Sequence, residues 1–201
     1  MIRVLLADDE ELIREAIAAL LGLEPDLEVV AGVGSGAEAV EAVRRHRPDV
    51  AVVDLQMPGM DGLEVTAELQ RVFPSCKVLI LTGRGRPPHL QKALAAGAKG
   101  FLPKGSPGGT LADVIRRVHR GERYVDPALA ADALTAPECP LTSRELEVLR
   151  LAEYDTPISV IAHRTSLSNG TVRNYLAAAV TKLGVRTRAE AFRLAHDNGW
   201  L

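Results

Sequence analysis

The chain has 201 residues, of which 25% are charged and 47% hydrophobic, so it can bury a core in one large domain or two small ones. This balance excludes global disorder, and a formal net charge of −2 is too small to identify a partner by charge alone. No apolar run approaches the ~20 residues that span a bilayer, and no signal peptide is evident, so we expect a cytoplasmic protein without a membrane partner.

The first 120 residues alternate between short apolar runs and amphipathic helical patterns. Five pairs of this kind favour a parallel sheet covered by helices on both faces. In the first helix, one stripe combines Leu12, Ile13, Ala16, Ile17 and Leu20. We predict strands at 2–7, 28–33, 50–53, 77–81 and 99–102, and helices at 10–22, 36–46, 62–72, 88–96 and 109–119.

Charged and polar side chains stand where these apolar runs end. Asp8 and Asp9 follow the first run, Asp54 follows the third, Thr82 the fourth and Lys104 the fifth. In open parallel sheets, ligands bind beyond the carboxyl ends of the strands, so these side chains should share one crevice.

Carboxylates held that close together repel one another, and a hard divalent cation such as Mg²⁺ relieves the repulsion. Asp54 could then attack a phosphorus atom in line, while Mg²⁺ and Lys104 neutralise the phosphoryl oxygens and Thr82 donates a hydrogen bond. The bland alternative, a set of solvated strand-end charges, does not explain why these residues end successive strands. The Gly/Pro-rich stretch 83–88 is either an element that responds to phosphorylation or the start of the fourth helix.

Residues 121–137 read as a linker with one short helix, which Asp126 caps and Pro127 begins. A purely helical domain follows over 138–201, opened by a capping box of Thr142 and Glu145. Its four predicted helices span 142–153, 157–164, 168–183 and 188–197. Residues 161–201 contain six basic and only two acidic residues, so this end of the chain carries a positive charge. Cys76 and Cys139 match no zinc or redox spacing and are expected to be reduced thiols.

The third of these helices has an apolar stripe of Val172, Leu176, Ala179, Val180 and Leu183. Its other face suits a major groove, where an arginine can bind guanine or phosphate and an asparagine can bind adenine. An ordinary exposed helix face is the alternative. The candidate DNA-contacting residues are Ser168, Asn169, Gly170, Thr171, Arg173, Asn174, Ala177, Thr181 and Lys182.

Residues 1–120 resemble a response-regulator receiver domain, a flavodoxin-like (βα)5 fold. The resemblance rests on Asp8-Asp9, on Asp54 with its Met57-Pro58-Gly59 turn, and on Thr82, Phe101 and Lys104. It implies that a sensor histidine kinase phosphorylates Asp54. It also implies that Asp9, Asp54 and the backbone carbonyl of Gln56 bind Mg²⁺ directly, that Asp8 binds it through water, and that Thr82 and Phe101 are switch residues.

Residues from about 138 to 201 resemble an all-α, four-helix LuxR/NarL-type helix-turn-helix domain. The matching runs include Leu141–Glu145, Gly170–Tyr175 and Lys182–Val185. The sequence departs from the family pattern at 154–160 and at Ala177, where a second basic residue is common, so dimerisation gains importance for DNA affinity. The Gly170–Tyr175 run and the C-terminus most resemble the desaturase-controlling regulators of membrane lipid fluidity.

We therefore interpret the chain as a two-component response regulator of the NarL/FixJ type and not as an enzyme acting on small molecules. Phosphorylation of Asp54 is expected to draw Thr82 and Phe101 inward, change the face formed by the fourth and fifth helices, and favour a homodimer that binds promoter DNA. Two alternatives stay open. The pocket could be vestigial in a transcription factor under other control, or the helical tail could bind protein instead of double-stranded DNA.

Overall fold

The computed structural model describes residues 1–83, 87–135, 137, 139–153 and 156–201. The chain divides into a first unit, Met1–Leu134, and a second unit, Thr135–Leu201. Within the described residues, no helix combines the length and apolar character that crossing a membrane requires.

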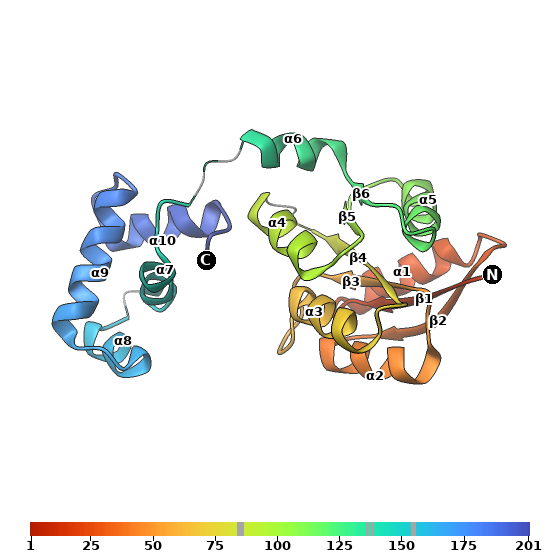
Figure 1. The fold of residues 1–201 in the computed structure, drawn as a ribbon, viewed down its shortest axis with the longest axis horizontal. Coiled ribbons are helices and arrows are strands. Elements are labelled where there is room, and N and C mark those ends of the chain that lie inside the picture. Colours follow the sequence, from red (N-terminus) through yellow and green to blue (C-terminus); the bar gives the residue numbers. More distant parts are fainter. Residues whose placement is uncertain (84–86, 136, 138, 154–155) are drawn as a thin grey trace. The chain divides into compact units, whose positions relative to one another are not determined.

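The first unit is a parallel sheet with helices on both faces (Figure 1). The strand order is β2-β1-β3-β4-β5-β6, so the order reverses beside β1 and β3. Its strands are β1 (Ile2–Ala7), β2 (Leu27–Val33), β3 (Val50–Asp54), β4 (Lys77–Thr82), β5 (Gly100–Pro103) and β6 (Tyr124–Val125). Its helices are α1 (Glu11–Leu21), α2 (Gly36–His46), α3 (Gly62–Val72), α4 (Pro87–Ala96), α5 (Gly108–His119) and α6 (Pro127–Thr135).

Alternating side chains of the central strands supply two cores, one on each face of the sheet. Leu5 and Val53 face the core that α2, α3 and α4 cover, whereas Leu6 and Val52 face the core beneath α1 and α5. Every residue of β3 is buried, as expected for a strand covered on both faces. The predicted doubly covered parallel sheet is therefore confirmed.

The first helix packs differently from the prediction. Leu12 and Leu20 are 80% and 48% exposed, and Ala16 is exposed as well. The α1 residues that pack in the core on this face of the sheet are Ile17, Ala18 and Leu21. The packed face therefore shares Ile17 with the predicted stripe but leaves Leu12, Ala16 and Leu20 exposed.

The segment expected to be a linker continues the first unit. Tyr124 and Val125 form β6, which pairs in parallel with Gly100 and Phe101 of β5. The short helix α6 follows and packs Leu129 and Ala133 against the core beneath α4. Within the part of the chain that the structure describes, the sheet therefore has six strands where five were predicted.

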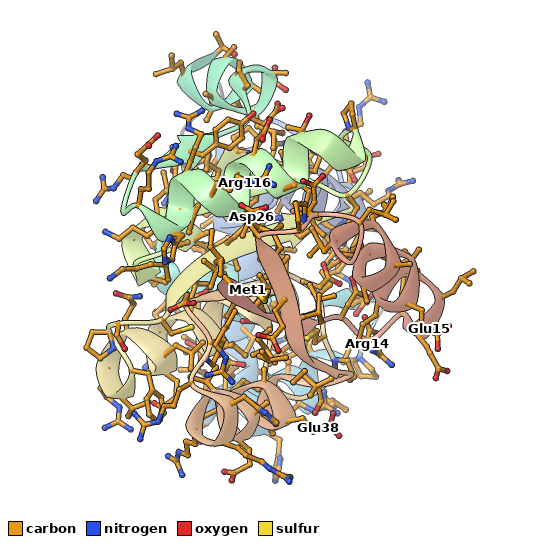
Figure 2. The ribbon with its side chains drawn as sticks, turned by 90° about the vertical axis from the view of Figure 1, so that its right-hand side faces the viewer. Met1, Arg14, Glu15, Asp26, Glu38 and Arg116 are labelled. Carbon is orange, nitrogen blue, oxygen red and sulfur yellow. The ribbon has the colours of Figure 1, made fainter. Side chains whose placement is uncertain are left out.

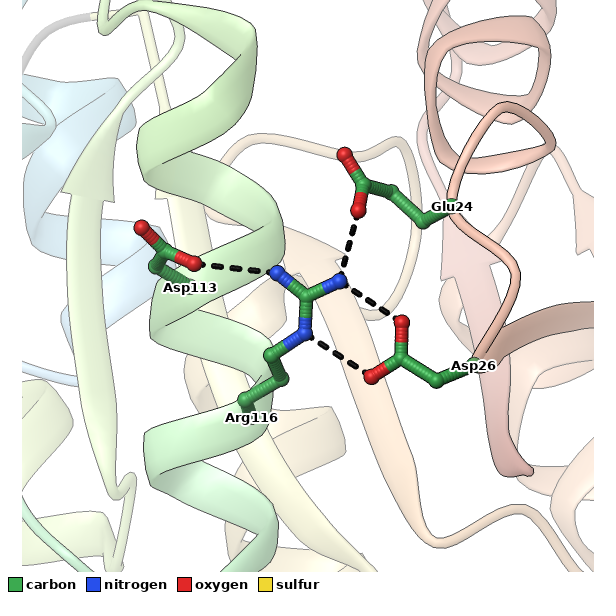
Figure 3. Close-up of polar contacts among 4 residues, drawn as sticks. All are labelled: Glu24, Asp26, Asp113 and Arg116. Atoms are coloured by element: carbon green, nitrogen blue, oxygen red, sulfur yellow. Dashed lines mark hydrogen bonds and ion pairs between the residues drawn. The ribbon is translucent and has the colours of Figure 1, made fainter.

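An ion-pair cluster on the α1–α5 side joins α5 to the loop before β2 (Figures 2 and 3). Arg116 donates to Glu24 at 2.6 Å, to Asp26 at 2.6 and 2.8 Å, and to Asp113 at 2.9 Å. The hydrogen bond from Arg116 holds the pKa of the Asp26 carboxyl at about 2. Arg116 thereby fixes α5 against the start of β2, at the sheet edge away from β6.

The second unit is helical. Its helices are α7 (Ser143–Arg150), α8 (Ile158–Thr165), α9 (Asn169–Lys182) and α10 (Arg188–Asp197). The predicted capping box is confirmed, since Thr142 accepts from the Glu145 N–H and Glu145 accepts from the Thr142 N–H. Val172, Leu176 and Ala179 of α9 are buried, and Val180 and Leu183 pack against them, as predicted.

Candidate functional site

The carboxyl ends of β1 and β3 place three acidic side chains together. Asp8 directly follows β1 and Asp54 ends β3, and these strands are neighbours where the strand order reverses. Carboxylate oxygens of Asp8, Asp9 and Asp54 all lie within 4.8 Å of one another. Asp8 and Asp54 are buried and Asp9 is exposed, so the cluster has two inner carboxylates and one at its mouth.

The Lys104 ammonium lies between the two buried carboxylates. The Lys104 N–H donates to the carbonyl of Thr82 at 2.8 Å, which fixes the backbone just after β5. From there, Nζ reaches Asp8 Oδ2 at 2.8 Å and Asp54 Oδ2 at 3.2 Å. A third carboxylate, that of Glu10, lies 3.0 Å away. Glu10 was absent from the expected site, and its contact joins residues 94 positions apart.

These contacts set the charge states of the pocket. Burial raises the pKa of the Asp54 carboxyl above its usual range, with Lys104 acting in the opposite direction and Asp8 adding to the rise. Burial alone would lower the pKa of Lys104, but hydrogen bonds to Asp8 and Glu10 and the charge of Asp54 outweigh it and raise that pKa. The pocket therefore holds a cation that stays protonated beside a carboxylate that is costly to ionise.

The donor set fits a hard divalent cation. Three carboxylates converge, and the pKa of the buried Asp54 carboxyl is raised, so a second positive charge would stabilise its ionised form. Oxygen ligands of this kind suit Mg²⁺. Gln56, expected to contribute its backbone carbonyl, follows β3 by two residues and has an exposed side chain.

The turn after β3 brings backbone close to Asp54. Gly59 has φ +79°, which favours glycine, and Asp61 caps α3 with its side chain. A Cβ on Gly62 would overlap the carbonyl oxygen of Asp54. The Met57–Gly62 turn therefore needs glycine at its end so that it can pack directly on the strand that carries Asp54.

The two expected switch residues are both inside the core. Thr82 ends β4 and is 1% exposed, and Phe101 in β5 is 0% exposed. Asp126 donates its N–H to the carbonyl of Phe101 at 3.2 Å, so β6 and the start of α6 are attached at this residue. Any inward movement of Phe101 would start from a ring that is already buried.

Residues 84–86 of the Gly/Pro-rich stretch lie outside the described residues. Pro87 begins α4, so the end of that stretch does start a helix. Tyr154 and Asp155, part of the departure from the family pattern, also lie outside the described residues. The chain after them is attached to α10, because Arg188 Nη1 donates to the carbonyl of Thr156 at 3.0 Å.

The second unit contains a helix-turn-helix formed by α8 and α9. The turn passes through Ser166, which has φ 56°, and Ser168 caps α9 by accepting from the Thr171 N–H at 3.1 Å. The face of α9 opposite its buried stripe is exposed at Asn169, Gly170, Arg173, Asn174, Ala177, Thr181 and Lys182. Lys182 differs from the others, because its Nζ donates to the buried carboxylate of Glu145 at 2.8 Å.

A flavodoxin-like sheet with an aspartate–lysine pocket, followed by a helix-turn-helix unit, defines a two-component response regulator. Residues 4–116 match the response regulator receiver domain family, and residues 139–195 match the luxR family of bacterial regulatory proteins. The chain therefore belongs to the response regulators that combine a receiver domain with a LuxR-type DNA-binding domain, as the sequence predicted.

Relatives share this arrangement from end to end. The transcriptional regulatory protein DesR of Bacillus subtilis is 42% identical over 200 residues, covering 100% of this chain and 99% of that protein. The response regulator RamR of Streptomyces coelicolor is 38% identical over 201 residues, covering 100% and 98%. Among solved structures, the receiver domain of a putative response regulator NarL from Mycobacterium tuberculosis is 35% identical with a TM-score of 0.59, covering 60% of this chain and 98% of that one.

Proposed function

We propose that Asp54 accepts a phosphoryl group from a sensor histidine kinase and that this modification controls DNA binding by the second unit. The supporting observation is the position of Lys104, whose ammonium contacts the buried carboxylates of both Asp8 and Asp54. A buried, desolvated carboxylate beside a fixed cation is suited to attack phosphorus, where negative charge gathers on the transferring oxygens.

In the proposed step, one carboxylate oxygen of Asp54 forms a bond to phosphorus. The bond from phosphorus to the histidine nitrogen of the kinase breaks, and that nitrogen keeps the electron pair. Lys104 is placed to bind one phosphoryl oxygen, and the Thr82 hydroxyl would donate to another. Mg²⁺ held by Asp9, Asp54 and the Gln56 carbonyl, with Asp8 acting through water, would neutralise the remaining charge.

The output of this modification is proposed to be a homodimer on promoter DNA. A change at Thr82 and Phe101 would alter the surface formed by α4 and α5 and favour pairing of two chains. Two copies of α9 then read half-sites about one helical turn apart. The proposed contacts are the exposed side chains and N-terminal N–H groups of α9, at Ser168, Asn169, Gly170, Thr171, Arg173, Asn174, Ala177 and Thr181, with Lys182 at its far end.

The proposed cellular setting follows from the family. A regulator that binds chromosomal DNA in a bacterium works in the cytoplasm. The resemblance of the Gly170–Tyr175 run and the C-terminus to the desaturase-controlling regulators makes control of membrane-lipid genes the first hypothesis to examine. Transcript profiles of a deletion strain complemented with wild-type protein or with Asp54→Asn would test this hypothesis, and unchanged lipid genes would reject it.

Phosphorylation is tested by incubating the protein with acetyl phosphate and Mg²⁺ and measuring the intact mass. We expect one added phosphoryl group on the wild type, none on Asp54→Asn, and none when EDTA removes the metal. Asp113→Asn, an equal charge change at an exposed side chain of α5, should be labelled like the wild type. An unlabelled wild type would favour a vestigial pocket.

DNA binding is tested separately with random duplex at several salt concentrations. Phosphate contacts release counterions, so the logarithm of the binding constant should fall steeply with the logarithm of salt concentration. A flat salt dependence would favour the alternative that the helical tail binds a protein.

A further inference from the structure

The pocket contains an acidic side chain that the proposed phosphoryl transfer does not use. Glu10 follows the acidic pair and is the N-cap residue of α1, but its side chain makes no hydrogen bond to the helix that it precedes. It extends toward Lys104 instead, with Oε1 3.0 Å from Nζ. The Glu10 N–H donates to Asp8 Oδ1 at 2.9 Å, which holds the Glu10 backbone beside the metal-binding carboxylates.

Among the described residues, three carboxylates surround the Lys104 ammonium, which has three N–H donors. The acceptors are Asp8 at 2.8 Å, Glu10 at 3.0 Å and Asp54 at 3.2 Å. An ammonium group has no further donor to offer. When a phosphoryl group arrives on Asp54, Lys104 can bind one of its oxygens only if an existing acceptor gives way.

Glu10 is the acceptor best placed to leave. The side chain of Asp8 is 5% exposed and that of Asp54 is 6% exposed, whereas that of Glu10 is 59% exposed. Water can solvate the Glu10 carboxylate once it swings out, so displacing it leaves no buried charge unpaired.

We propose that Glu10 occupies the Lys104 donor that a phosphoryl oxygen on Asp54 requires, and so competes with the incoming phosphoryl group. The inference rests on the proposed phosphorylation of Asp54 and adds a residue that sets how readily the pocket accepts an anion. Glu10 acts through Lys104 and is therefore a positioning residue. Its negative charge at the mouth of the pocket also repels anionic phosphodonors, more strongly the greater their charge.

Glu10→Gln is the informative change because it keeps the shape of the side chain and removes its charge. Glu11→Gln is the matched control. Glu11 is exposed and begins α1, so it shares the charge change and the position near the helix N-terminus, and no ion pair with Lys104 is found for it among the described residues.

Fluoroberyllate, an analogue of the phosphoryl group, serves as the probe, with its binding followed by fluorine NMR. Each variant is measured at a Mg²⁺ concentration that a titration shows to be saturating. A change in metal affinity then does not affect the measured Kd for fluoroberyllate. We expect Glu10→Gln to lower the apparent Kd about two- to fivefold, the size of one partly exposed ion pair, and Glu11→Gln to leave it unchanged. The difference in apparent Kd between Glu10→Gln and the wild type should shrink in 1 M salt, where the screening length is about 3 Å.

A second readout uses the charge of the phosphodonor. Glu10→Gln should raise the labelling rate with acetyl phosphate more than with phosphoramidate, which carries less negative charge. A general structural effect would change both rates in proportion. Glu10→Ala, checked for native circular dichroism, repeats the test with a side chain that cannot hydrogen-bond.

The outcomes separate this inference from the proposed function. A wild type that binds no fluoroberyllate would reject phosphorylation at Asp54 itself. A wild type that binds, with Glu10→Gln and Glu10→Ala equal to it or weaker, would leave the proposed function standing and overturn the competing role of Glu10.

Discussion

The carboxylate of Glu145 accepts a hydrogen bond of 2.8 Å from Nζ of Lys182, 37 residues later. The same oxygen accepts the N–H of Thr142 at 2.7 Å. Because Glu145 is buried, the contact joins the end of α9 to the capped start of α7 inside the second unit. Lys182 thus has a structural partner inside the second unit, besides the contact with DNA that is proposed for it.

Lys182→Met is therefore expected to lower the free energy of unfolding of the second unit. The change leaves the buried Glu145 carboxylate without its cation, and we expect a loss of about 1–2 kcal/mol, less than for a fully buried pair because Lys182 stays partly exposed. Urea unfolding followed by circular dichroism measures the loss. An unchanged stability together with a salt slope smaller by about one would instead identify Lys182 as a phosphate contact.

Arg173→Ala, in contrast, should weaken DNA binding and leave stability nearly unchanged. Arg173 is exposed near the N-terminus of α9, so its loss should leave stability within about 0.5 kcal/mol. DNA affinity should fall by about 1–3 kcal/mol if Arg173 binds a base, or the salt slope should fall by about one if it binds phosphate. Arg193→Ala on α10 is the control of equal charge, and an equal loss of affinity in both variants would argue against a recognition role for α9.

Gly62→Ala should disturb the pocket without touching any charged group. The added Cβ would overlap the carbonyl oxygen of Asp54, so the turn or β3 must shift, at a cost of about 1–3 kcal/mol. Because this shift moves Asp54, the rate at which acetyl phosphate labels Asp54 should also fall. Gly109→Ala is the control, because a Cβ there meets nothing within 4 Å and alanine favours a helix by at most about 1 kcal/mol. Full labelling of Gly62→Ala would show that the turn does not position Asp54.

Asp54→Asn should stabilise the metal-free protein at neutral pH. Burial raises the pKa of Asp54, so between its usual pKa and the raised one the folded state holds a proton that the unfolded state has lost. The stability contributed by this group therefore falls as pH rises through that window. Asparagine does not ionise, so the variant lacks this loss of stability.

Urea unfolding midpoints of both proteins in EDTA, measured over a series of pH values, test this direction of the pH dependence. The stability advantage of Asp54→Asn should shrink as pH falls through the raised pKa toward the usual carboxyl range. Saturating Mg²⁺ should also reduce the advantage, because the metal stabilises the ionised wild-type carboxylate. An advantage that does not change with pH would mean that burial of the charge is not its cause.

Much of the first unit could be predicted because strands and helices repeat with different periods. The ends of parallel strands meet at one edge of the sheet, so the order of the apolar runs was enough to bring Asp8, Asp54 and Lys104 together. The capping box of Thr142 and Glu145 was equally clear, since it depends on residues three apart.

Other features depend on contacts that leave no local pattern. The strand β6 has two residues, too few to show a period. An apolar stripe on a helix does not reveal how much of it the sheet will cover. Leu12 and Leu20 were therefore predicted on the packed face, although both are exposed. The partners of Lys104 and Lys182 include glutamates far away in sequence, and only the folded chain brings Glu10 and Glu145 to them.

The attachment of α6 to the first unit gives a last prediction. Leu129 and Ala133, four residues apart, place one face of α6 against the core beneath α4, while Leu134 is 88% exposed. Leu129→Ala should therefore lower the stability of the first unit by about 1–2 kcal/mol, less than for a fully buried leucine. Leu134→Ala is the same chemical change on the exposed side and should cost almost nothing.

Hydrogen exchange distinguishes local release of α6 from a general loss of stability. In Leu129→Ala, amides of α6 should exchange faster while those of β3 and β4 keep their protection, because only the packing of the helix is weakened. Since β6 is bonded to the backbone of Phe101, faster exchange at Tyr124 and Val125 would connect the helix to the expected switch residue. Equal exchange in Leu129→Ala and Leu134→Ala would mean that α6 is not held by its apolar face.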